Sequence, residues 1–323
     1  MDTAAVALPE ALSADDVPAR PWWRDVLRRF ARDRWAIGAA ILLIGVHVAA
    51  ITAPWIAGRV LHQSPYRTHI MDRVTLHGRL QDVVSEDGIP LGPGAAFPLG
   101  ADALGRDVLA RVLFGARVSL LVSTFGTLLG VAVGLIAGLF AGYYRGWLDT
   151  IISRFIDAMM AIPVLLLAIA LAAVLHQGSV WMIVLILGLV NWTNLARLIR
   201  AEVLSLRERD FVEAARALGA SDTSIMLRHL VPSLTGPVIV FATLSMAGNI
   251  LLESALSFLG VGIQPPTPSW GNMIQEGMPL YTVAWWISLF PGLAILLTVI
   301  CYNLVGEALK ASLDPGATKG PRG

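Results

Sequence analysis

The sequence predicts an all-α integral membrane protein with six transmembrane helices, and two observations carry this prediction. Of the 323 residues, 56% are hydrophobic and only 15% are charged, whereas a soluble domain averages about 25% charged residues. The apolar residues also gather into long blocks, and a helix of about 20 residues crosses a hydrocarbon core of roughly 30 Å. The six blocks span residues 36–57, 118–142, 157–176, 180–198, 233–256 and 283–305.

Composition argues against several other classes of protein. The 24 Lys and Arg residues nearly balance the 23 Asp and Glu residues, and the resulting net charge of +1 disfavours a strongly basic nucleic-acid binder or an acidic disordered tail. The single cysteine, Cys301, excludes intrachain disulfides and multi-cysteine metal sites. Only Lys310 and Lys319 are lysines, and neither follows a glycine, so the chain lacks the Gly-Lys pair of a phosphate-binding P-loop.

The first apolar block is predicted to be a membrane span that is not cleaved. The competing interpretation is a secretory signal peptide, but the block follows a polar stretch, residues 1–34, and exceeds the 7–15 apolar residues of a signal core. Residues 21–32 predict an amphipathic helix in the membrane interface, with its arginines near lipid headgroups. The alternative is an ordinary solvated segment that precedes the first span. The apolar face of this helix would carry Trp23, Val26, Leu27 and Phe30.

The arginines predict the orientation of the spans, because cytoplasmic loops carry an excess of Lys and Arg. Arginines gather before the first block, after the second and after the fourth, while the loop 257–282 on the opposite side has no Lys or Arg. The outer segment has seven arginines, but its 60 residues are too many for it to set the topology. Both termini are therefore predicted to be cytoplasmic. The chain then divides into a cytoplasmic segment 1–34, a first span 35–57, an extracytoplasmic segment 58–117, a five-span core 118–306 and a cytoplasmic tail 307–323.

The segments between the spans carry turn signals. Only residues 176–179 separate the third and fourth blocks, which predicts a tight helical hairpin. In the outer segment, residues 85–94 are rich in Gly, Pro and acidic side chains, as is typical of turns. No metal site is predicted, because the spacings of seven and eight residues between the outer histidines match no metal-binding motif; these are His62, His69 and His77.

The loop 199–232, between the fourth and fifth blocks, predicts a short helix that ends in a glycine turn. Asp210 and Glu213 form a capping-box-like start, in which both side chains can reach free backbone N–H groups. Gly219 suits the left-handed conformation that ends a helix. The helix would carry an apolar stripe of Phe211, Ala214, Ala215 and Leu218.

A second short helix is predicted to follow, beginning at Ser221 with Asp222 near its positive end and stopping before Pro232. No bilayer lipid covers the apolar stripe of the first helix, whereas a soluble partner with a groove would. The alternative is a helical hairpin that folds back on its own protein.

This loop resembles the EAA loop of ABC importer permeases, whose pattern runs Glu-Ala-Ala, three residues, Gly, nine residues, Ile, any residue, Leu-Pro. Residues 228–232 read Arg-His-Leu-Val-Pro and resemble the Arg-His-Ile-Leu-Pro form of the peptide/nickel branch. The resemblance implies that the loop couples the chain to an ATPase. The residues that would take part are Asp210, Phe211, Glu213, Ala214, Ala215, Leu218, Gly219, Ala220, Arg228, His229 and Pro232.

Two outer motifs resemble signatures of the same branch. Residues 99–111 resemble its Gly-Thr-Asp…Gly-Arg-Asp motif, with Ala101 in place of the usual threonine, and residues 257–271 match its second signature almost without change. Over about residues 21–315, the chain is thus similar to the dipeptide and oligopeptide permease C subunits (DppC/OppC-like). The motif residues are Gly100, Asp102, Gly105, Arg106, Asp107, Gln264, Pro265, Pro266, Trp270 and Gly271.

The resemblance implies an ABC type I importer permease fold in the bacterial inner membrane. A second, non-identical permease (DppB/OppB-like) would complete the pore, and an extracytoplasmic solute-binding protein would deliver the solute. One or two ATPase subunits (DppD/DppF-like) would bind ATP and Mg²⁺, so this subunit would need no cofactor and would not be an enzyme. Peptides are the expected substrate, and nickel, glutathione or another small solute of the same branch is the alternative.

Asn249 and Glu253 in the fifth block are candidate pathway residues, because they lie four residues apart on one helix face. A charge in mid-helix costs about 2.5–3.5 kcal/mol on insertion scales, so Glu253 is expected to face the pore or a partner subunit. A hydrated position near the helix end is the alternative. A different class of function, a stand-alone secondary transporter that uses Glu253 as a proton site, would need no partners.

Three further patterns concern packing. Residues 260–271 contain three prolines and predict a stiff outer loop that serves as a docking surface or a re-entrant gate. Glycines at every fourth position of the second block predict a smooth ridge for close helix packing; they are Gly126, Gly130, Gly134 and Gly138. An interfacial aromatic belt is predicted from Trp270, Trp285 and Trp286.

Overall fold

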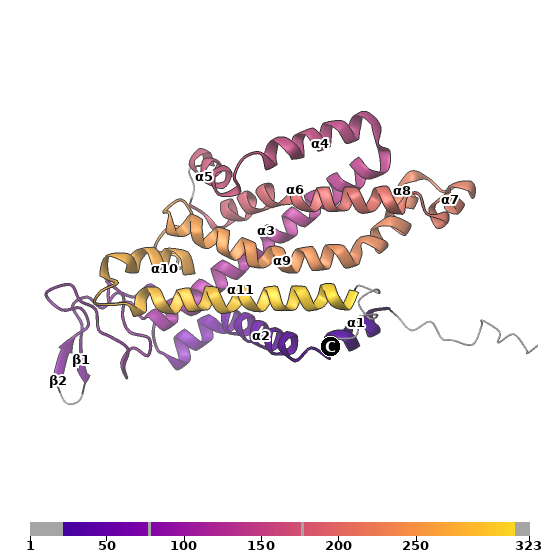
Figure 1. Cartoon of the computed structure of the whole chain (residues 1–323). Coiled ribbons are helices and arrows are strands. Elements are labelled where there is room, and N and C mark those ends of the chain that lie inside the picture. Colours follow the sequence, from indigo (N-terminus) through magenta and orange to yellow (C-terminus); the bar gives the residue numbers. More distant parts are fainter. Residues whose placement is uncertain (1–21, 77–78, 176–177, 314–323) are drawn as a thin grey trace, which may run out of the picture.

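A computed structural model describes residues 22–76, 79–175 and 178–313. Long helices lie side by side, with a β-hairpin at one end of the molecule and two short helices, α7 and α8, at the other (Figure 1). The elements are α1 Trp22–Phe30, α2 Arg34–Trp55, β1 Arg73–Leu76, β2 Arg79–Asp82, α3 Val108–Tyr144, α4 Gly146–Met160, α5 Val164–Leu175, α6 Val180–Leu206, α7 Asp210–Ala217, α8 Asp222–Ile225, α9 Val231–Phe258, α10 Trp270–Gly277 and α11 Trp286–Leu313.

Within these described ranges, five helices are long and apolar enough to cross a membrane. A sixth crossing is reached if the bent pair α4 and α5 counts as one span. The prediction of a mostly helical membrane protein is confirmed. The predicted segment 1–34 lies largely outside the described residues, as do His77, the connection at residues 176–177 and the end of the tail, residues 314–323.

The third predicted block, residues 157–176, is not one helix. It begins inside α4, and the chain bends by 92° before α5 starts at Val164. Pro163 explains the break, because it has no N–H to donate to the preceding turn and its ring clashes with that turn. A hydropathy window counts the apolar side chains on both sides of such a break as one run.

The fifth block also begins earlier than predicted. The second short helix does not stop before Pro232: α8 passes through a π-helical turn, Met226–Leu230, directly into α9. Pro232 is the second residue of α9 and directly follows the π-helical turn, so the proline, which has no N–H to donate, lies where the hydrogen-bond pattern changes from π- to α-helical. The loop and the fifth span are therefore mechanically continuous over Asp222–Phe258.

The glycine ridge of α3 packs against α6, as predicted. A Cβ atom added at Gly134 would lie 2.7 Å from the Trp192 carbonyl oxygen, and one added at Gly138 would lie 2.5 Å from that of Ala196. Backbone contact this close is possible only without side chains on the ridge. α3 and α6 are thereby packed backbone to backbone, and α3 crosses the bundle from the end with the β-hairpin toward the end with α7 and α8 (Figure 1).

The two ends of the bundle differ in character. α1 forms over the predicted amphipathic segment, lies at the same end as α7, α8 and the end of α11, and exposes Trp23 and Leu27 (Figure 1). At the other end, β1 and β2 pair antiparallel, with Arg73 opposite Asp82. This hairpin was not predicted; a four-residue strand gives too short a pattern to recognise.

Candidate functional site

The short helices α7 and α8 form the predicted hairpin. Gly219 between them has φ of 79°, which confirms the left-handed turn. Ser221 caps α8, since its Oγ accepts a hydrogen bond from the Ser224 amide at 3.3 Å. The predicted capping box at the start of α7 is wrong: Arg209 is the N-cap residue and caps with no side-chain bond. Asp210 and Glu213 instead lie inside the first turn, where the positive end of the helix dipole stabilises their negative charge.

The apolar stripe of α7 is divided between two faces. Val212 and Ala215 are buried in a core cluster of their own chain, so Ala215 does not belong to the free face. Phe211 remains partly exposed, and Leu218 is 88% exposed. Leu227, which the sequence analysis missed, adds a third exposed apolar side chain at this end, at 60% exposure. The hairpin therefore packs one face on its own protein, and its other face, which a partner would cover, is exposed.

Polar contacts tie the hairpin to the long helices. The Tyr143 hydroxyl at the end of α3 donates to Asp222 Oδ1 at 2.6 Å. Arg207, just after α6, donates to the Tyr143 carbonyl and holds its guanidinium 5.9 Å from the Tyr143 ring centroid. A hydrogen bond with Tyr143 also raises the pKa of Arg216 on α7. Sequence spacing gave no signal for these contacts, because about 80 residues separate Tyr143 from Asp222.

At the opposite end, the first outer motif builds a buried charge cluster. Asp102 Oδ2 accepts from Arg106 Nε and from Arg111 Nη1, both at 2.6 Å. Glu276 of α10 pairs with the same two arginines, at 2.7 and 2.9 Å. Asp107 caps α3 by accepting from the Ala110 amide at 2.6 Å. Burial raises the pKa of the Asp107 carboxyl, against the lowering effect of hydrogen bonds from the Ala110 and Leu109 backbone amides.

The aromatic belt prediction is wrong for two of its three tryptophans. Trp270 is 1% exposed and donates through Nε1 to the Val112 carbonyl at 3.1 Å. Trp286 is 7% exposed and donates to the Ala101 carbonyl at 2.9 Å, packed on Gly100. Each indole N–H finds a backbone acceptor inside the protein, which the residue type cannot reveal. Trp285, at 51% exposed, is the one that faces outward.

The second outer motif folds back on the bundle. Gln264 donates to the Gly260 and Gly262 carbonyls at 2.8 and 3.2 Å, which closes the turn directly before Pro265 and Pro266. Ser269 and Asn272 form a capping box at the start of α10. A Cβ at Gly271 would lie 2.3 Å from the Ser254 carbonyl oxygen, so α10 rests directly on α9.

Glu253 lies in a cluster of hydroxyl groups of its own chain. It is fully buried, and it accepts hydrogen bonds from Ser119 and Ser257 at 2.8 Å and from Ser254 at 3.5 Å. The same hydroxyls accept from backbone amides of the second motif, Ser119 from Trp270 and Ser257 from Ile263. Glu253 thus avoids lipid by contacts within the subunit that the sequence analysis did not consider.

Asn249 lies one turn away beside a cavity of about 450 Å³ between α5, α6 and α9. Its side chain donates to Thr127 Oγ1 at 2.8 Å and accepts from Asn191 Nδ2 at 2.5 Å. The other polar residues of the cavity lining are Asn194 and Ser245. The structure therefore separates the two candidate pathway residues: Asn249 lines the cavity and Glu253 does not.

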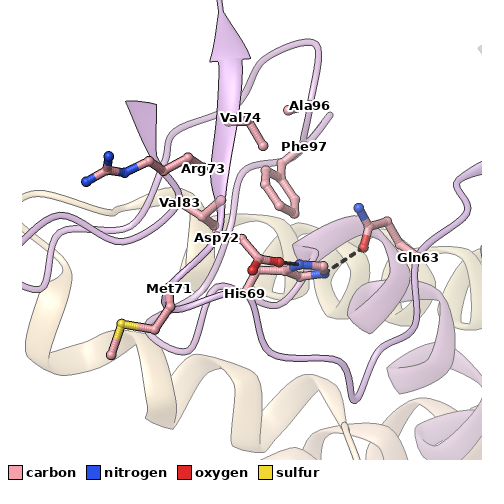
Figure 2. Close-up of a pocket in the computed structure, with 9 residues that line it drawn as sticks. All are labelled: Gln63, His69, Met71, Asp72, Arg73, Val74, Val83, Ala96 and Phe97. Carbon is pink, nitrogen blue, oxygen red and sulfur yellow. Dashed lines mark hydrogen bonds and ion pairs between the residues drawn. The ribbon is translucent and has the colours of Figure 1, made fainter. Parts of the chain in front are cut away.

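A second pocket, of about 490 Å³, lies in the outer segment (Figure 2). His69 stands between Asp72 and Gln63, with its ring nitrogens 2.6 and 3.1 Å from their side-chain oxygens (Figure 2). Its ring meets Phe97 edge to face. Across residues 22–76, 79–175 and 178–313, no group of three His, Cys, Asp or Glu side chains is placed to hold a metal ion.

Comparison with known proteins places these sites in a family context. Residues 134–319 match the model of the binding-protein-dependent transport system inner membrane component, and residues 21–76 match the N-terminal transmembrane domain of oligopeptide transport permease C.

Individual proteins agree with this match. The chain is 41% identical to the glutathione transport system permease protein GsiD of Shigella flexneri serotype 5b (strain 8401), over 91% of this chain and 90% of that protein. Identity to GsiD of Escherichia coli O6:K15:H31 (strain 536 / UPEC) is 39% over the same shares. The fold is similar to an inward-facing structure of the MetNI methionine ABC transporter, with a TM-score of 0.50, 18% identity, and 64% of this chain and 97% of that chain covered.

Proposed function

Since the chain belongs to the family of binding-protein-dependent inner membrane transport components, in its dipeptide, oligopeptide and nickel branch, we propose that it forms half of the pore of a peptide importer. It is a permease subunit of an ABC importer in the inner membrane. The family implies ATPase and binding-protein partners. Which solute crosses, and which subunits assemble with it, are the parts that we propose.

The observation that carries the proposal is the α7–α8 hairpin. It exposes an apolar face with Phe211 and Leu218, while hydrogen bonds and continuous helix join it to α3 and α9. A soluble ATPase that binds this face would move two membrane helices with it. ATP and Mg²⁺ would be bound on that partner, and Glu213, exposed on α7, would pair with one of its basic residues.

The proposed topology has six spans, with the bent α4–α5 pair as the third. The α7–α8 end, α1 and the C-terminal tail would lie in the cytoplasm, in agreement with the arginine bias. The outer motifs and the β-hairpin would face the solute-binding protein. A second, non-identical permease would close the pore.

The substrate that we propose is a short peptide, and glutathione is the specific candidate. Glutathione is itself a tripeptide. The relatives that are 39–41% identical to this chain are glutathione permeases, and the match covers nine-tenths of their length. Nickel, which belongs to the same branch of the resemblance, is the alternative solute.

Affinity purification and reconstitution test the proposal. The tagged chain should recover an ATPase and a second permease. Liposomes that contain this complex and its binding protein should accumulate labelled glutathione or trialanine only when ATP is present. Recovery of the chain alone with transport activity would instead favour the secondary transporter and contradict the proposal.

A further inference from the structure

The cavity between α5, α6 and α9 combines three features that an ordinary packing defect in a membrane protein does not have. The first is depth. Asn194 is the fifteenth of the 27 residues of α6, and Ser245 is the fifteenth of the 28 residues of α9. Ser245 lies in the middle of the apolar block 233–256, and Asn194 lies within the apolar block 180–198, one turn before Arg197. Lipid offers no hydrogen bonds to polar side chains in these apolar blocks.

The second feature is unused hydrogen-bonding capacity. Among the residues that the structure describes, neither the Asn194 amide nor the Ser245 hydroxyl has a hydrogen-bond partner. Both side chains are at least partly exposed. Asn249, by contrast, uses both ends of its amide inside the protein and holds Asn191 at the cavity wall. Unpaired polar groups at this depth are tolerated only where water, a solute or another protein meets them.

The third feature is the break between α4 and α5. The helix is interrupted at residues 161–163, and Val164, the first residue after the break, lines the cavity. Non-helical backbone at membrane depth is tolerated where it is buried in protein or lines a water-filled space. Broken helices beside a mid-membrane site are also how several transporters build their solute pathway.

From these features we infer that Asn194 and Ser245, supported by Asn191, contact the solute on its way through the membrane and select for amide-bearing, peptide-like molecules. The inference rests on the proposed peptide transport and deepens it. Asparagine and serine each donate and accept hydrogen bonds, as a peptide unit does. None of the nine lining residues is charged or carries a thiol or imidazole, so the polar groups of this wall are neutral amides and a hydroxyl.

The main competing occupant is a helix of the second permease, and cysteine accessibility separates the two. In the assembled importer in nanodiscs, with Cys301→Ala as background, Asn194→Cys and Ser245→Cys should react with a membrane-impermeant thiol reagent. Trialanine together with the binding protein should slow the reaction at least fivefold. Leu189→Cys is the matched control: it is on α6 and 38% exposed, but five residues away on another face, and it should stay unreactive. Unreactive cysteines at both 194 and 245 would assign this wall to the permease interface and overturn the inference.

Transport supplies the second readout. The ratio of peptide accumulated to ATP hydrolysed should fall about tenfold in Asn194→Leu/Ser245→Ala liposomes, which corresponds to about 1.4 kcal/mol. The peptide is glutathione or trialanine, whichever the unmodified importer accumulates. The ratio should be unchanged in Leu189→Ala. A purely structural role would lower assembly and both rates together, and would leave the ratio intact. If the unmodified importer moves no peptide, the proposed function fails; if it moves peptide and the double variant keeps the ratio, only this inference fails.

Discussion

At the scale of single residues, the polar groups of this protein are placed by contacts between segments far apart in the sequence. Asp102 and Glu276 hold two arginines at one end of the bundle, and Tyr143 holds Asp222 at the other. These contacts fix the two surfaces at which soluble partners would bind. Motif matching identified Asp102 and Arg106, but not Glu276 or Tyr143.

Asp102→Asn is expected to destabilise the outer end strongly. Asp102 is 2% exposed, and its loss leaves Arg106 and Arg111 buried with half of their charge compensation. Removing one member of a buried ion pair costs about 3–5 kcal/mol, so thermal unfolding of the purified protein should shift down by several degrees. Asp82→Asn is the matched control, because the Arg73–Asp82 pair is exposed and such pairs contribute about 0–1 kcal/mol. Equal shifts in the two variants would contradict this role for the cluster.

Tyr143→Phe is expected to weaken coupling while it leaves the fold intact. It removes the hydroxyl that donates to Asp222 and keeps the ring beside Arg207. A hydrogen bond to a charged group contributes about 1.5–3 kcal/mol. ATP hydrolysis in the reconstituted importer should therefore respond less to the loaded binding protein. Tyr144→Phe, with no hydroxyl contact among the described residues, should behave as the unmodified importer. If ATP hydrolysis responds fully to the loaded binding protein in both variants, the Tyr143–Asp222 hydrogen bond has no role in coupling.

At the scale of elements, what a helix does depends on whether it is continuous. α8 runs into α9 through a π-helical turn, so the coupling hairpin and the fifth span share one axis. α4 and α5 are separated by a 92° bend, and Val164 at the start of α5 lines the cavity. The α3–α6 pair is closely packed, because its glycines bring the two backbones into contact.

Gly138→Ala tests the close packing of this pair. The new Cβ would lie 2.5 Å from the Ala196 carbonyl oxygen, which is backbone and cannot turn aside. Overpacking costs about 1–3 kcal/mol, and the unfolding temperature in detergent should fall. Gly45→Ala in α2 meets nothing within 4 Å and should be neutral or stabilising by up to about 1 kcal/mol. The prediction fails if the two alanine variants unfold at the same temperature.

At the scale of the whole molecule, the proposed function places an ATPase at the α7–α8 end of the bundle and a solute-binding protein at the end that carries the β-hairpin. In this proposal the hairpin would transmit motion only if α7 and α8 keep their mutual angle. The left-handed Gly219 sets that angle, and the exposed Glu213 and Leu218 offer the surface to the partner.

Gly219→Pro and Glu213→Lys should each leave the protein in the membrane but uncouple it. Proline fixes φ near −65°, whereas Gly219 has φ of 79°; lysine reverses the charge that faces the ATPase. Both variants should assemble with their partners and lose substrate-dependent ATP hydrolysis. Normal stimulation in either reconstituted variant would remove the corresponding residue from the coupling role.

The sequence by itself determined the membrane class, the helical spans, the glycine ridge and the turn at Gly219, because these depend on local hydropathy and backbone preference. Side-chain partners could not be read in the same way. Glu253 found its partners in serines of two helices, and Trp270 and Trp286 found backbone acceptors in the interior. The sequence analysis also missed the break at Pro163, which the backbone chemistry of proline explains, and the continuity of the helix through Pro232. Only the tertiary structure brought Asn194 and Ser245 to one cavity, because hydrogen bonds between helices depend on rotation and register that a single helix does not encode.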